Sequence, residues 1–90
     1  MITLIRAIVA KIEKMTEAEM RLGGANAVSP RGRVHVTIDV WLAYHHLALF
    51  LNMAPAYTLN SVSVKEYPAL VLEIKTLARQ AEIYLEFLES

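Results

Sequence analysis

Apolar residues recur at every third or fourth position at both ends of the chain, the spacing that places them on one face of a helix. Near the N-terminus this pattern consists of Ile5, Ile8, Val9, Ile12 and Met15. Near the C-terminus it consists of Leu70, Ile74, Leu77, Ala81, Tyr84 and Leu88. The first pattern predicts a helix over residues 2–22, which should end at Gly23 and Gly24 because glycine readily takes positive φ.

The start of the last helix carries two conflicting signals. Ser63 and Glu66 have the spacing of a capping box, which favours a helix beginning there. Pro68 would then lie inside that helix, where it lacks an amide proton and crowds an earlier carbonyl. We therefore predict a short turn near residues 63–66 and regular helix from Pro68, so that the last element covers about residues 66–88.

The middle of the chain allows two interpretations. Val34, Val36, Ile38 and Val40 alternate with polar residues, which is typical of a strand, and residues 57–64 offer a second segment that favours strand. Alternatively, Thr37 caps a helix over residues 37–52, with Asp39 in its first turn. We prefer an all-α fold of three main helices (2–22, 37–52 and 66–88) in a small bundle, forming one domain over residues 1–90. The alternative is an α+β fold with short strands near 33–39 and 57–64.

No Asp, Glu, Lys or Arg occurs between Val40 and Val64. A helix that is apolar all round is buried on most sides, and a chain of 90 residues has few elements with which to surround it. We therefore expect a second copy to complete the burial, most simply in a homodimer. The expected interface residues lie on the middle and last helices: Trp41, Tyr44, His45, His46, Leu49, Phe50, Leu77 and Tyr84.

Composition narrows the functional classes. Apolar residues make up 56% of the chain, a surplus that association would cover. There is no cysteine, which excludes disulfides, thiol catalysis and thiolate zinc sites, and is compatible with a cytoplasmic location. Nine basic and nine acidic residues cancel, so no net field attracts nucleic acid or an anionic membrane. Two histidines, Asn52 and Pro55 interrupt the uncharged residues 40–59, so we expect no membrane span there.

His45 and His46 are the residues that most resemble a chemical site. Neighbours on a helix point about 100° apart, so the two imidazoles cannot bind one metal ion together. Neither has a second ligand four residues away, and no serine lies in a recognisable nucleophile motif. We therefore predict no catalytic residue, no metal and no cofactor. An enzyme or cofactor-binding oligomer with an inter-subunit site around His45 and His46 remains the alternative.

The loop Ser29–His35 holds three basic side chains, those of Arg31, Arg33 and His35, which are candidates for binding a partner. Without aromatic residues for stacking they are a weak nucleic-acid signal, and such a binder is a second alternative. The sequence thus predicts a small soluble helical protein that acts by self-association and protein–protein interaction. An adaptor, a regulator or inhibitor, and an assembly component all fit this description, with nucleic acid and membrane not expected as partners.

Overall fold

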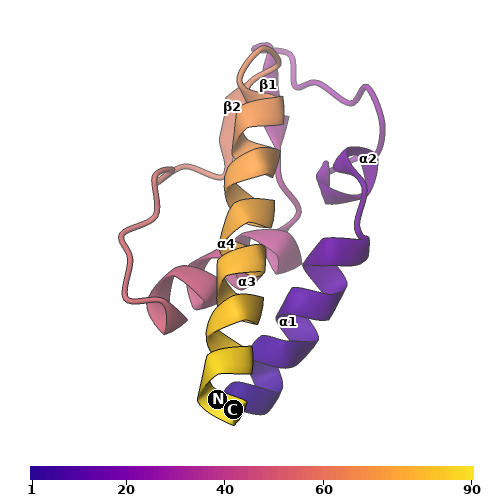
Figure 1. Ribbon diagram of the computed structural model, residues 1–90. Coiled ribbons are helices and arrows are strands. Elements are labelled where there is room, and N and C mark those ends of the chain that lie inside the picture. Colours follow the sequence, from indigo (N-terminus) through magenta and orange to yellow (C-terminus); the bar gives the residue numbers. More distant parts are fainter.

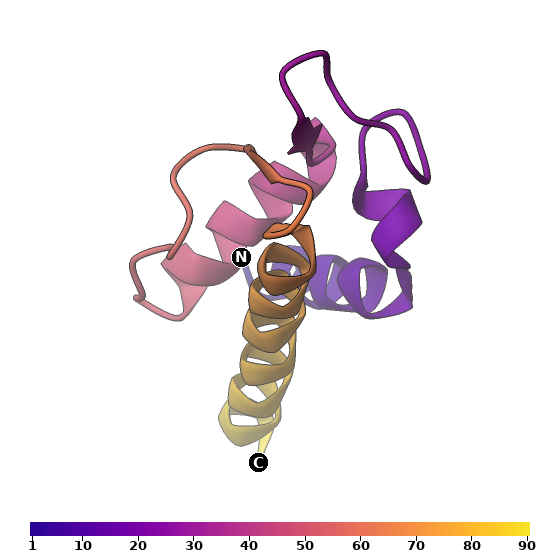
Figure 2. The same cartoon turned by 90° about the horizontal axis from the view of Figure 1, so that it is seen from above.

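The computed structural model describes all residues from 1 to 90, and most of them are helical (Figure 1). The elements follow one another as α1 (Ile2–Lys14), α2 (Glu17–Met20), β1 (Arg33–His35), α3 (Ile38–Phe50), β2 (Ser61–Ser63) and α4 (Tyr67–Glu89). Helix α4 runs along most of the molecule, which measures 48 × 23 × 17 Å. Helix α1 packs against α4, which it crosses in the view of Figure 2, and α3 packs against both helices (Figures 1 and 2).

The two strands form a small antiparallel sheet, in which Val34 lies opposite Val62. Both valines are buried, whereas their neighbours along each strand are half-exposed, as period-two alternation requires. Our preferred all-helical fold lacked these strands and needs this correction. The strands of the α+β alternative are present but shorter than its ranges 33–39 and 57–64, because α3 begins at Ile38 and a loop without strand pairing precedes Ser61.

The predicted continuous helix over residues 2–22 is wrong. The chain turns extended at Met15, and α2 then begins with Thr16 as its N-cap. The Thr16 hydroxyl accepts from the Glu19 amide, and the Glu19 carboxylate accepts from the Thr16 amide, forming a complete capping box. The chain leaves the helix again at Arg21, which pairs with Val36 beside the sheet before the two glycines are reached.

Helices α3 and α4 begin and end within two residues of their predicted limits. Thr37 is the N-cap of α3 and Asp39 lies in its first turn, although the Thr37 hydroxyl caps no backbone amide. Before α4, the Glu66 amide donates to the Ser63 hydroxyl, closing the expected turn. Helix α4 then starts at Tyr67, so Pro68 lies in the first turn, where helices tolerate proline.

The core draws apolar side chains from every element and contains no buried polar or charged residue. Its largest fully enclosed side chains are Tyr44, Ile5, Ile12, Met20, Leu47, Leu70 and Ile74. Helix α4 buries the face that its sequence pattern predicted, apart from Tyr84 and Leu88, which are 41% and 45% exposed. None of the helices combines the length and the apolar character needed to cross a bilayer.

Candidate functional site

The chain itself covers one side of α3 and leaves the other side open. Of the eight predicted interface residues, Tyr44 and Leu77 are enclosed by the chain's own core and have almost no surface left for a second copy. Leu49 and Tyr84 are exposed. The remaining four are half-buried at the border between the two sides: Trp41, His45, His46 and Phe50. The eight predicted residues therefore combine side chains that the core of the chain encloses with side chains that remain accessible.

The open side of α3 carries a row formed by Ile38, Leu42, His45 and Leu49, which we call the outer stripe. The spacing of four, three and four residues places the four side chains on one face of the helix. The three aliphatic side chains are 66%, 54% and 67% exposed. Ile38 and Leu42 were missed from sequence, because a helix with apolar residues on both sides gives no sign of which side faces outward.

The imidazole of His45 is held by its own helix. Its Nδ1 lies 3.0 Å from the carbonyl oxygen of Trp41, an acceptor, so Nδ1 carries the proton and donates it. The ring also contacts the ring of Trp41, with centroids 4.7 Å apart. Its Nε2 has no hydrogen-bond partner within the chain. No group of three or more His, Asp or Glu side chains in the chain is arranged to hold a metal ion.

The hydroxyl of Tyr44 belongs to the interior. It donates to the carboxylate of Glu73 at 3.0 Å and accepts from the amide of Tyr57, which ties the loop after α3 to α4. Burial, together with the nearby Glu73 carboxylate, raises the pKa of Tyr44 above its ordinary value. Tyr44 therefore joins α3, the loop that follows it and α4 in the interior.

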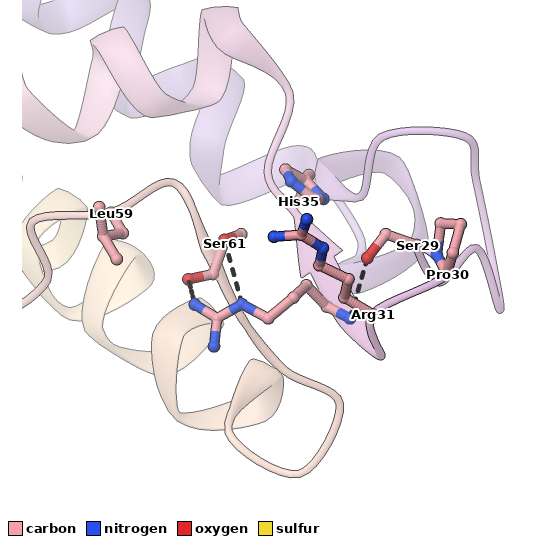
Figure 3. A pocket seen from close by; sticks show the side chains of 7 residues that line it. Ser29, Pro30, Arg31, His35, Leu59 and Ser61 are labelled. Carbon is pink, nitrogen blue, oxygen red and sulfur yellow. Dashed lines mark hydrogen bonds between the residues drawn. The ribbon is translucent and has the colours of Figure 1, made fainter.

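The three basic residues of the 29–35 loop come together at a second place. Together with four neighbours they line an open hollow of about 610 Å³ beside the sheet, which we call the basin (Figure 3). Its lining residues are Ser29, Pro30, Arg31, Arg33, His35, Leu59 and Ser61. The lining includes two arginines, one histidine and two hydroxyl groups, and no carboxylate.

Hydrogen bonds within residues 29–33 fix the conformation of the loop that forms one side of the basin. The amide of Gly32 donates to the carbonyl of Ser29, closing a turn in which Pro30 sets φ and Gly32 takes a φ of +75°. The Ser29 amide donates to the Arg33 carbonyl, and the Arg33 amide donates to the Ser29 hydroxyl. Arg31 is therefore placed at the tip of a short loop that is closed on itself.

A carboxylate pair lies in a separate groove between α1 and α4. A hydrogen bond with Glu82 is the main cause that raises the pKa of Glu13, and the charge of Glu82 adds to it. Arg79 pairs with Glu82, and Arg6 pairs with Glu89 at the end of the same groove. Because cations accompany these acids and both Arg79 and Glu13 are exposed, the arrangement is a solvated ion-pair surface between two helices.

Comparison with known proteins does not assign the chain to a family. No protein-family model matches it, and no curated protein and no solved structure is significantly similar to it.

Proposed function

We propose that this protein acts by self-association, as a homodimer in which the outer stripes of α3 from two copies pack together. The observation that carries the proposal is the outward exposure of Ile38, Leu42 and Leu49 on a helix that has no formal charge after Asp39. Contiguous apolar surface of this kind on a soluble chain marks a site of interaction. In the pair, the three long helices of each copy, α1, α3 and α4, would form a bundle with the two α3 helices at its centre.

The outer stripe favours a second copy of the same chain as its binding partner. In a two-fold symmetric contact, each surface meets itself with the chain direction reversed. An axis passing between His45 and His46 would place Leu42 of one copy against Leu49 of the other, and His45 against His46. Leu42 and Leu49 would thus meet across the contact, and the outer stripe brings no acidic side chain, lysine or arginine to it.

Further apolar side chains are exposed where the last turn of α3 contacts α4. The ring of Phe50 contacts Tyr84 at a centroid distance of 5.4 Å, and Tyr84 stacks on Phe87 at 6.4 Å. Phe87 is 70% exposed. A stable interface buries about 1,200–2,000 Å² in total, which exceeds what one helix face offers. The addition of the aromatic rings of Phe50, Tyr84 and Phe87 extends the surface towards that size.

The test is the solution mass of the purified protein and of two double variants. We expect the natural sequence to have twice the chain mass of 10.1 kDa in sedimentation equilibrium. Leu42→Glu with Leu49→Glu should convert it to a monomer, because carboxylates would be buried without partners at the contact. Both side chains are more than half exposed, so the variant should retain the helical circular dichroism of the parent.

The matched control is Leu22→Glu with Leu72→Glu, at a position after α2 and at one in the first half of α4. These side chains are 58% and 68% exposed, close to the values of Leu42 and Leu49, but belong neither to the outer stripe nor to the aromatic group at the end of α4. This variant should remain a dimer. A natural chain that stays monomeric at every concentration tested would contradict the proposal, and so would equal dissociation by both double variants.

Such a dimer would serve as an adaptor, a regulator or an assembly component, acting through the surfaces that remain outside the contact. The absence of cysteine suits a reducing, cytoplasmic location. The basin lies at the sheet, on loops that the outer stripe does not include, and would stay accessible in the dimer.

A further inference from the structure

We propose that the basin binds a phosphate monoester, with the phosphate on Arg31, Arg33 and His35 and the remainder of the ligand on Pro30 and Leu59. This inference does not depend on dimer formation. It depends on a lining that offers hydrogen-bond donors and no carboxylate, in a protein whose total formal charge is zero. The positive charge is therefore a local property of this hollow.

Arg33 is the positioned group of the basin. Its Nε donates to the Ser61 hydroxyl at 3.3 Å, and its Nη2 donates to the Ser61 carbonyl at 2.6 Å (Figure 3). A guanidinium has five N–H donors, so three of them remain for a ligand. The side chain is half-buried and its conformation is already set by Ser61, which reduces the entropy lost when an anion binds.

No acidic side chain neutralises Arg33. Glu66 lines an adjoining hollow that shares Arg33, Leu59 and Ser61. Its carboxylate, however, accepts from the Ser63 hydroxyl at 3.2 Å, and the ion pairs of the chain include neither Arg33 nor Arg31. Two guanidinium groups without carboxylate partners at one hollow favour the planar, bidentate recognition of phosphate oxygens.

The hydroxyl groups of the basin add neutral donors. Ser29 accepts from the Arg33 amide and Ser61 accepts from the Arg33 guanidinium, so each hydroxyl proton is free to point towards a ligand. The volume of about 610 Å³ lies within the range of small-molecule sites. Leu59, which is 65% exposed, gives the basin an apolar wall beyond the charged groups.

The experiment titrates the ¹⁵N-labelled full chain with inorganic phosphate and with phenyl phosphate, following amide shifts at constant ionic strength. We expect saturable shifts at residues 29–35 and 59–61, with phenyl phosphate binding more tightly than phosphate. Arg31→Ala should weaken both ligands about tenfold, the loss expected for one charge-assisted contact. Leu59→Ala should reduce only the advantage of phenyl phosphate over phosphate.

The controls separate this site from general attraction of anions. Lys14→Ala removes an exposed cation outside the basin and should leave both affinities unchanged. Shifts that do not saturate by about 10 mM ligand would overturn the proposal, as would an equal loss in Lys14→Ala and Arg31→Ala. Binding of a single-stranded oligonucleotide with a steep salt dependence, which indicates contacts to several phosphates, would also overturn the proposal and would favour nucleic-acid binding.

Discussion

Lys75 of α4 stabilises the place where the first helix breaks. Its ammonium group donates to the carbonyl of Ile12 at 2.9 Å and to the carbonyl of Met15 at 2.7 Å. Carbonyls at the end of a helix have no partner within that helix, and the dipole there favours a positive charge. The Ile12 carbonyl also accepts from the Met15 amide at 3.2 Å, so one side chain from α4 adds to the hydrogen bonding at the end of α1.

We predict that Lys75→Met lowers the free energy of unfolding by about 1–2 kcal/mol, because it keeps much of the apolar stem but removes the charged donor. Urea denaturation measures this change. Lys65→Met is the matched control, since Lys65 is exposed in the turn before α4 and makes no hydrogen bond or ion pair. Equal midpoints for the two variants would show that the helix end does not need Lys75.

Two polar contacts connect different helices, one between α4 and α2 and the other between α1 and α3. The hydroxyl of Tyr67, at the start of α4, donates to the Glu17 carbonyl in α2, and Arg21 lies 5.4 Å from the centre of the Tyr67 ring. Lys11 of α1 donates to the carboxylate of Asp39 in the first turn of α3. The Tyr67 hydrogen bond is partly buried, whereas the Lys11–Asp39 ion pair is exposed and is therefore screened by salt.

The Lys11–Asp39 ion pair predicts that the stability of the fold depends on pH. The hydrogen bond from Lys11 is the main cause that lowers the pKa of Asp39 from 3.8 to about 2. Because the folded pKa is the lower one, the contribution is complete above about pH 4 and is lost as the pH falls towards 2. Both side chains are about half exposed, so we expect less than about 1 kcal/mol.

Unfolding curves between pH 5 and pH 2 for the natural chain and for Asp39→Asn measure this effect. The difference in stability between the two should shrink as the pH falls through about 4 to 2. In a Lys11→Met background, the effect of Asp39→Asn at pH 5 should become much smaller, because the main partner is gone. A difference that stays constant with pH would contradict the assignment.

Over the whole molecule, self-association links stability to concentration. If α3 packs against a second copy, mass action stabilises the folded chain more as the protein concentration rises. We predict that the melting temperature of the natural chain increases with concentration, whereas that of Leu42→Glu with Leu49→Glu does not. Differential scanning calorimetry over a hundredfold range of concentration checks this, and a constant melting temperature for both chains would argue for a monomer.

The candidate sites were predictable from sequence to different degrees. Arg31, Arg33 and His35 were grouped correctly because they are close in sequence, and a turn with Pro30 and Gly32 brings them together locally. Leu59 and Ser61 could not be added, because only the pairing of β1 with β2 brings that segment to the loop. On α3, uniform apolar character concealed which side the core would take.

By itself the sequence determines the limits of α4, because helical periodicity and Pro68 act within a few residues. The limits of α3 also lie within two residues of the predicted ones, although the Thr37 side chain makes no hydrogen bond to a backbone amide of the helix. The Thr16–Glu19 capping box was equally local and would have located the break after α1. The strands and the outward side of α3 depend instead on contacts between distant parts of the chain. Strands pair across a long separation in the chain, and the side of an all-apolar helix that is buried depends on which neighbours pack against it.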